Sequence, residues 1–467
     1  MNAVRKHILM SIVARSVLLF LWLSFASGAS GAPPAANMNA APLKRYLVFT
    51  AAAASKAVAS GARVVRETRG LKAVLCSPAL AEALGLTEDI PVQALDSAAN
   101  TEVMAIPVQN LGLTGRGRKI VILDTGYNYN HPELRSSYLG GTNFVNPGRD
   151  ALDDNGHGSH VAGIITGDGI NPRARGIAPE AGIIAGKVLD AYGNGYISDI
   201  VAGIYWGVDG PDGYYGTDDD FQADAISISI GATGNYTYLS VFCDAAVPSM
   251  TDAIKYAIDH GVPVVIAAGN NGVSGVSLPG CVSYALTVGA IDATNGLAYF
   301  SGIGPSVDLV APGVGLYSSS LGTSYKSMDG TSQATPVVSG TIALLKEAFP
   351  NASVNDIENA LQTTAVDLGY LGKDNHYGWG RVDAYQALSV LTANLATVAL
   401  TVSCSNGQAL ISWPSIPPGF SLQASTSPGA GEIGWHTVTN GTSTIGNQNT
   451  AALSMEPTGQ FYRLRWQ

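Results

Sequence analysis

The chain contains the stretch Lys119-Ile120-Val121-Ile122-Leu123-Asp124-Thr125-Gly126, in which an apolar run ends on an acid and a turn. A continuous apolar run predicts a strand that is buried on both faces, because a half-exposed strand would alternate apolar and polar residues. Four further runs of this kind follow, at residues 183–189, 225–230, 262–268 and 285–288. Helical stretches lie between or after them, at residues 198–208, 250–260 and 331–349. This alternation predicts an α/β fold, in which helices cover both faces of a parallel sheet.

Polar side chains stand where two of the predicted strands end. Asp124 directly follows one apolar run, and Asn270 follows another in the sequence Gly269-Asn270-Asn271-Gly272. Ligand sites in sheets of this kind lie at the carboxyl ends of the strands, so we expect both side chains near a site. Taken singly, each residue is more typical of an ordinary turn.

A histidine and a serine in glycine-containing motifs complete the set of candidates. His157 lies between two glycines, which leave its imidazole accessible. A metalloprotease helix would place two histidines four residues apart beside a glutamate, and this segment does not, so we interpret His160 as a packing or hydrogen-bonding residue. Ser332 follows Gly330 at the start of an Ala/Val-rich helical stretch, where free N–H groups favour negative charge. In isolation, such a serine is more typical of a helix cap.

The decisive feature is the order Asp, His, Asn, Ser along the chain, because Asp-His-Ser is one of three orders known for a Ser-His-Asp triad. Around these residues the sequence resembles the subtilisin-like serine proteases, over residues 112–388. The matching motifs are Ile120–Gly126, Asp154–Gly163, Gly269–Gly272 and Gly330–Pro336. The resemblance implies the subtilisin-like fold and a serine endopeptidase that cleaves protein or peptide substrates through an acyl-enzyme, with no required cofactor.

The resemblance also implies a role for each candidate. Ser332 is expected to be the nucleophile, and His157 the general base and then the acid. Asp124 is expected to orient the imidazole, and the Asn270 amide to help hold the oxyanion.

Two further expectations follow from the resemblance. An extended substrate is expected to pair with Gly193-Asn194-Gly195 and Ser229-Ile230-Gly231, although turn glycines and a strand end explain these segments equally well. Structural calcium is common in the family, and an acidic, glycine-rich loop could supply oxygen ligands, although its spacing fits no fixed calcium motif and favours a solvated loop. The candidate ligands in this loop are Asp212, Asp218, Asp219 and Asp220.

The N-terminal segments predict export and processing. Residues 1–29 are typical of a secretory signal peptide, because Arg5 and Lys6 precede a short apolar core and small residues follow it. That core is well short of the roughly 20 residues that span a bilayer, so we expect a secreted protein without stable membrane insertion. After a spacer at residues 30–42, we expect residues 43–100 to form a small α+β module, which resembles the family's propeptide and would make the chain a zymogen. A plain structural module is the alternative.

The predicted catalytic domain covers residues 101–392, and a separate C-terminal domain covers residues 393–467. Short alternating segments separated by Gly/Pro/Ser/Asn-rich turns predict a small all-β sandwich there. This domain could attach the enzyme to a cell surface or a polymer, although core packing is the more typical role of its tryptophans. These tryptophans are Trp413, Trp435 and Trp466.

The charge and the cysteines of the chain limit its partners and its redox state. The 467 residues carry a net charge of −10 and no basic block, which excludes a nucleic-acid partner. Cys243 and Cys281 could form a disulfide in an exported protein, or remain two buried thiols.

Two rival functions stay open. One is a non-catalytic surface or binding protein built on a protease fold. The other is an acid-active carboxyl-serine peptidase, which would carry Glu and Asp where this chain keeps His157 and Asn270.

Overall fold

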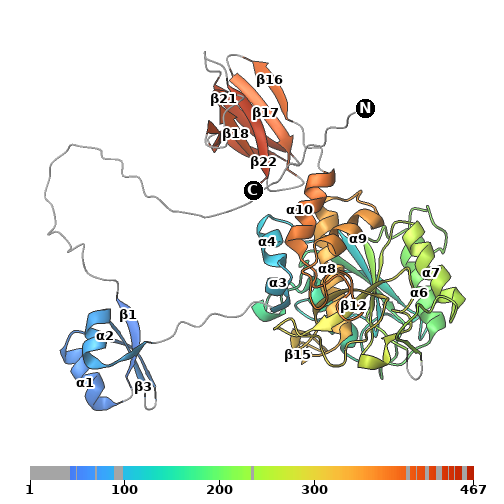
Figure 1. Ribbon diagram of the computed structural model, residues 1–467, viewed down its shortest axis with the longest axis horizontal. Coiled ribbons are helices and arrows are strands. Elements are labelled where there is room, and N and C mark those ends of the chain that lie inside the picture. The colour runs from blue at the N-terminus through green and yellow to red at the C-terminus, as the bar shows by residue number, and fades with distance from the viewer. Residues whose placement is uncertain are drawn as a thin grey trace, which may run out of the picture. The chain divides into compact units, whose positions relative to one another are not determined.

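The structure is a computed structural model, whose helices and strands are labelled in Figure 1. The chain divides into two compact units, Met1–Gln93 and Ala94–Gln467. The signal peptide and the spacer predicted for residues 1–42 lie outside the described residues. The structure describes residues 43–48, 50–68, 71–88, 98–232, 236–395, 400–405, 408–415, 420–427, 434–439, 441–445, 448–454 and 460–466.

The first unit contains a small α+β module, as its sequence predicts. Its antiparallel sheet has the order β2-β3-β1-β4. The elements are β1 (Lys44–Val48), α1 (Ala51–Ala59), β2 (Arg63–Thr68), β3 (Leu71–Cys76), α2 (Pro78–Leu84) and β4 (Thr87–Glu88). Each helix begins at a hydroxyl cap, Thr50 or Ser77, whose side chain accepts an N–H from the first turn. Tyr46, Ala57 and Val74 are among the residues that form its own apolar core.

The second unit is built around a parallel sheet of seven strands with the order β13-β12-β10-β8-β5-β7-β6. The strands are β5 (Lys119–Asp124), β6 (Tyr138–Asn143), β7 (Gly182–Lys187), β8 (Ala225–Ile228), β10 (Val264–Ala267), β12 (Leu286–Ile291) and β13 (Val307–Pro312). Five of these coincide with the apolar runs, within a few residues. The predicted α/β fold is confirmed.

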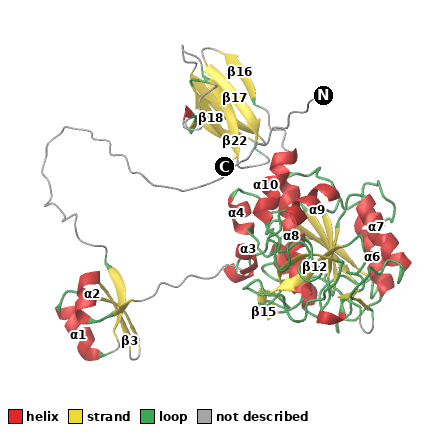
Figure 2. Cartoon of the chain, in the orientation of Figure 1, coloured by secondary structure: helices red, strands yellow, loops and turns green. Residues whose placement is uncertain are grey.

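Alternate side chains of each strand enter separate cores on the two faces of the sheet. On β5, Ile120 and Ile122 pack into one core, whereas Val121 and Leu123 pack into the other. Figure 2 shows helices on both sides of the strands. The first core includes residues of α3 (Ala98–Glu102), α4 (Ala105–Asn110), α5 (His157–Thr166), α8 (Thr331–Ala348), α9 (Val354–Thr363) and α10 (Ala384–Leu395). The second includes residues of α6 (Ile197–Asp209) and α7 (Pro248–Asp259).

The sequence did not reveal the two edge strands, and the reason is physical. β6 has the sequence Tyr-Leu-Gly-Gly-Thr-Asn, and most of its residues are partly or fully exposed, so it lacks an apolar run. β13 carries Asp308 inside the strand, where its carboxylate accepts the backbone N–H of Thr287 at 2.9 Å and the ammonium of Lys373 at 2.9 Å. An edge strand tolerates such interruptions because only one neighbour pairs with it.

The second unit begins earlier than residue 101, the predicted start of the catalytic domain. Helix α3 already contributes Ala99 to the core, and the Asn100 amide donates to the carbonyl of Arg175 at 2.7 Å. At the other end, α10 continues to Leu395, past the predicted boundary at residue 392. Short helices of this kind carry too few residues for a clear apolar period.

The C-terminal strands form two antiparallel sheets, β16-β17-β21-β20 and β19-β18-β22, which confirms the predicted all-β fold of this part of the chain. The strands are β16 (Thr401–Ser405), β17 (Gln408–Pro414), β18 (Phe420–Ser425), β19 (His436–Thr437), β20 (Thr442–Ile445), β21 (Gln448–Ser454) and β22 (Phe461–Trp466). Trp413 is buried with Ile411 and Leu422, so the role of a surface contact is wrong for this tryptophan. Trp435 is half-buried beneath the Arg463 guanidinium, 4.5 Å from the ring centre.

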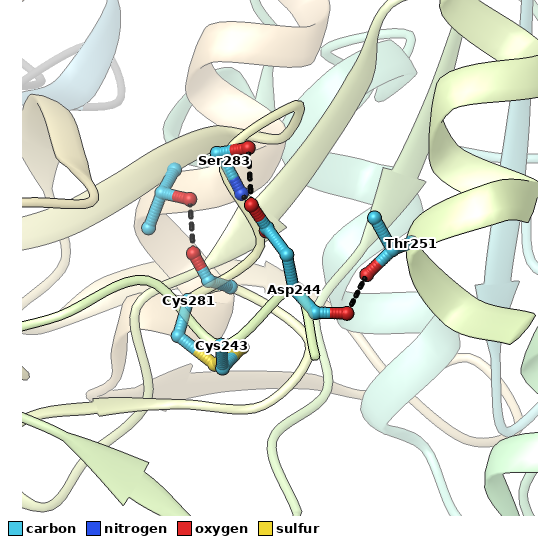
Figure 3. Close-up of a disulfide and its surroundings, with 7 residues drawn as sticks. Cys243, Asp244, Thr251, Cys281 and Ser283 are labelled. Carbon is cyan, nitrogen blue, oxygen red and sulfur yellow. Dashed lines mark hydrogen bonds between the residues drawn. A yellow bond between two sulfur atoms is a disulfide. The ribbon is translucent and has the colours of Figure 1, made fainter. Parts of the chain in front are cut away.

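A disulfide joins Cys243 to Cys281, with the two Cα atoms 5.4 Å apart (Figure 3). This pairing decides between the two alternatives that the sequence left open. The adjacent Asp244 carboxylate accepts the backbone N–H and the hydroxyl of Ser283, both at 2.8 Å.

In the described part of the chain, no helix is long and apolar enough to cross a membrane.

Candidate active site

The structure brings two sequence-predicted residues, Asp124 and His157, into direct contact. Asp124 is the last residue of β5, and His157 is the first residue of α5. Their Oδ1 and Nδ1 atoms are 2.8 Å apart. The same carboxylate oxygen accepts the backbone N–H of Thr125 at 2.7 Å, and only 1% of Asp124 is exposed. The acid is therefore held in one orientation against the imidazole.

The start of α5 is fixed by a second buried acid, Asp153. One oxygen of its carboxylate accepts the Thr125 hydroxyl and the N–H groups of Asn155 and Gly156, at 2.9 to 3.0 Å. The other oxygen accepts the N–H and the hydroxyl of Ser159. Burial raises the pKa of Asp153, but these hydrogen bonds outweigh burial and hold the pKa below its ordinary value. Asp153 thus joins the turn after Asp124 to the helix that carries His157.

A glycine is required for the close approach of α5 to β5. A Cβ at Gly158 would lie 2.2 Å from the carbonyl oxygen of Gly126 and 3.2 Å from Oδ1 of Asp124. The backbone N–H of Gly158 also donates to the Thr125 hydroxyl at 2.9 Å. Any larger residue would push His157 away from its acid.

The electrostatic surroundings of His157 favour its charged form. Burial has the largest single effect and lowers the pKa, but the charge of Asp124, the hydrogen bond to it and the charge of Asp153 together outweigh burial. The pKa of the imidazole is therefore raised above its ordinary value. About a fifth of the side chain, 22%, is accessible from outside.

Ser332 stands in the first turn of α8, beyond Gly330, whose φ of 155° suits glycine. The Ser332 hydroxyl donates to the carbonyl of Ser229 at 3.0 Å, and the Ser229 hydroxyl donates to the carbonyl of Ser332 at 2.8 Å. This reciprocal pair ties the predicted nucleophile to the predicted substrate segment. Within the described residues, no hydrogen bond joins Ser332 to His157. Such contacts are often long before substrate binds.

The Asn270 side chain has a defined orientation beside Ser332. Its Oδ1 accepts the backbone N–H of Thr331 at 2.9 Å and the Thr331 hydroxyl at 3.0 Å. These two bonds assign the amide, so Nδ2 is the atom left to donate elsewhere. Asn270, Thr331 and Ser332 line one cavity of about 370 Å³ together with Gly231 and Ala232.

The two predicted substrate segments meet at a second cavity. Gly193, Asn194 and Gly195 line it from one side, and Ile230 and Gly231 from the other. Its volume is about 340 Å³. The other lining residues are mainly apolar: Leu189, Tyr196, Ile197, Ile200, Ala232, Tyr236, Val247, Leu278 and Pro279.

Comparison with known proteins identifies the family of this chain. The model of the subtilase family matches residues 115–380, more than half of the chain. The chain belongs to the subtilase family. It is 40% identical over 290 residues to Subtilisin BL of Lederbergia lenta, which covers 62% of this chain and 96% of that protein. It is 37% identical over 334 residues to the alkaline protease of Alkalihalobacillus alcalophilus, which covers 69% of this chain and 80% of that protein. Subtilases are serine endopeptidases, and protein substrates follow from the family.

Three residues of this subtilase site were not singled out in the sequence. Asp153 directly precedes the motif Asp154–Gly163, and Thr331 lies within the motif Gly330–Pro336. Asp153 fixes the turn before His157, and Thr331 fixes the Asn270 side chain, in both cases through hydrogen bonds. An acid a few residues before a helix start can accept free N–H groups of the first turn, and this is the signal that Asp153 offers. The third is Lys187, a lysine at the end of a buried strand, and no sequence signal marked it.

The carboxylates of the acidic loop of this subtilase are engaged by groups of the loop itself. Asp219 accepts the N–H of Asp212 at 2.9 Å, and Asp220 accepts the N–H of Gly216 at 2.8 Å. Among the described residues, no group of three or more His, Cys, Asp or Glu side chains could hold a metal ion. Calcium takes six to eight oxygen ligands, and its binding by this loop stays a prediction.

Proposed function

We propose that this chain is a secreted serine endopeptidase in which Ser332 attacks the scissile carbonyl, His157 moves the proton and Asp124 orients the imidazole. The observation that carries the proposal is the contact of 2.8 Å between Asp124 and His157, at the edge of the sheet where α8 presents Ser332. The buried acid accepts the Nδ1 proton, so the other ring nitrogen, Nε2, is the one that can act as a base.

Over one catalytic cycle, Ser332 loses its hydroxyl proton and regains one at the end. Nε2 of His157 takes the proton of the Ser332 hydroxyl as Oγ bonds to the substrate carbonyl carbon, and the imidazolium is stabilised by Asp124. The imidazolium then gives that proton to the leaving amine as the peptide bond breaks. Water attacks the acyl-enzyme with His157 again as the base, and Ser332 regains its proton when the acid product leaves. The raised pKa of His157 supports a base of adequate strength.

The oxyanion of the tetrahedral intermediate is held by two donors in this proposal. They are Nδ2 of Asn270, whose other amide atom is occupied by Thr331, and the backbone N–H of Ser332 in the first turn of α8. Loss of one such donor costs roughly 100- to 1,000-fold in kcat, a magnitude measured on a member of this family.

The substrate is proposed to bind as an extended strand between residues 193–195 and residues 229–231. The apolar cavity between these segments supports a preference for an apolar side chain in the substrate, because burying such a side chain is favourable. Secretion rests on the N-terminal sequence. Attachment through the C-terminal domain and calcium-dependent stability both stay predictions, the latter checked by unfolding with and without a chelator.

The decisive experiment compares wild type with Ser332→Ala. We expect wild type to hydrolyse casein and peptide substrates and to be labelled by a fluorophosphonate probe. Ser332→Ala should lose the label and more than about 1,000-fold in kcat, because the hydroxyl that forms the acyl-enzyme is removed. Equal activity of the two proteins would contradict the mechanism, and an inactive, unlabelled wild type would favour the non-catalytic binding protein.

A further inference from the structure

The ammonium group of Lys187 lies buried beneath the site and has no part in the mechanism above. Lys187 ends strand β7, next to β5, and only 2% of its side chain is exposed. Its three protons match three acceptors: the carbonyl of Thr125 at 2.5 Å, Oδ1 of Asp154 at 2.7 Å and the carbonyl of Leu189 at 2.9 Å. A fully satisfied buried ammonium of this kind fixes the positions of its partners.

Each of the three acceptors belongs to a different segment of the site. Thr125 directly follows Asp124, the proposed acid. Asp154 stands between the buried Asp153 and the turn that begins the helix of His157. Leu189 lines the apolar cavity and leads into the substrate segment, where the carbonyl of Asn194 accepts the N–H of Asp190 at 2.7 Å.

We propose that Lys187 is a positioning residue, which holds the acid, the histidine turn and the substrate edge in one mutual geometry. It acts through these segments and does not touch the substrate. The inference rests on the proposed function, because it assigns Lys187 a place in the same reaction. Positioning of this kind matters because a displacement of about 1 Å at reacting groups can cost roughly 100-fold in rate.

The chain offers a matched control for the general cost of disturbing a buried lysine. Lys346 is also buried, and its ammonium donates to the carbonyl of Ala352 at 2.6 Å. It lies on α8, the helix of Ser332, about four turns further along. Replacing Lys346 therefore perturbs the core and the nucleophile helix without releasing any segment that Lys187 holds.

The test measures kcat and KM on a peptide p-nitroanilide long enough to reach residues 193–195, and the rate of fluorophosphonate labelling, for folded Lys187→Met and Lys346→Met. We expect Lys187→Met to lose about 10- to 100-fold in kcat and in labelling rate, and to show a raised KM, because both the dyad and the substrate edge shift. Lys346→Met should lower the unfolding temperature and leave kcat, KM and labelling at the wild-type level.

Asp154→Ala keeps the test decisive if Lys187→Met fails to fold. The Asp154 side chain is itself 54% exposed, but its removal frees one of the three segments and takes from the buried ammonium the carboxylate that neutralises it, so we expect a lower unfolding temperature. We expect a loss of about 3- to 10-fold in kcat at temperatures where the variant stays folded. Wild-type kcat in Asp154→Ala, or in a folded Lys187→Met, would overturn the proposal, as would an equal loss in Lys346→Met. A wild-type protein without activity or labelling would instead refute the proposed function.

Discussion

At the scale of the residue, two histidines on one helix show how surroundings decide chemistry. His160 is fully buried, its Nε2 contacts the carbonyls of Leu316 and Lys326, and burial lowers its pKa to about 4. It stays neutral and packs, as the sequence predicts. His157 lies one turn earlier, beside Asp124 and Asp153, and its pKa is raised. The same side chain therefore serves as a hydrogen-bonding residue in one place and as the proposed base in the other.

The raised pKa of His157 predicts the acid limb of the pH profile. The base must be neutral, so kcat/KM should fall as the pH drops through a value above the ordinary 6.5 of histidine. Asp124→Asn removes the charge that raises the pKa, so the limb should move to lower pH while kcat falls by roughly 10,000-fold, the size seen for this change in an unrelated enzyme with the same triad. The checks are the pH dependence of kcat/KM and an NMR titration of the imidazole. An unshifted titration in Asp124→Asn would argue against the dyad.

At the scale of the element, the disulfide fastens the segment between β9 (Thr237–Tyr238) and α7. This segment is held by pairing of β9 with β11 (Val276–Ser277), by the bond between Cys243 and Cys281, and by the hydrogen bonds of Asp244 (Figure 3). The two ends of the segment are close to Tyr236 and Val247, which line the apolar cavity. The disulfide therefore affects both the stability of the fold and the wall of the proposed substrate site.

Removal of this link has a predicted cost. Cys243→Ser combined with Cys281→Ser should lower the free energy of unfolding by about 2–4 kcal/mol, because the open chain regains the entropy of a loop with a sequence separation of 38. Denaturant unfolding without reductant measures the change. Cys404→Ser is the matched control, since this thiol is free and exposed, and it should leave stability unaltered. An unchanged unfolding midpoint in the double variant would show that the disulfide contributes nothing.

At the scale of the whole molecule, the division into two compact units bears on maturation. The module at residues 43–88 has its own sheet and apolar core, so it can be separated from the catalytic unit without opening the latter. We predict that secreted, active protein begins after this module. N-terminal sequencing of the secreted form measures the start directly. A fully active chain that begins near residue 29 would mean that the module is a permanent part of the enzyme.

The sequence by itself determined the α/β class, the strands of the sheet centre and the four candidate residues. Buried parallel strands favour apolar runs, and each motif places its functional residue at a strand end or within two residues of a glycine. It also predicted the C-terminal sheets from their alternation. These signals are local, which is why they can be read along the chain.

Only the tertiary structure decided which groups meet. The edge strands β6 and β13, the pairing of Cys243 with Cys281, the buried position of Trp413 and the acceptors of Lys187 depend on segments far apart in the chain. In the sequence, Lys187 is only a lysine within the apolar run at residues 183–189. Its three partners come from three different loops at the edge of the sheet, and only the packing of strands β5 and β7 side by side brings them within reach of one ammonium.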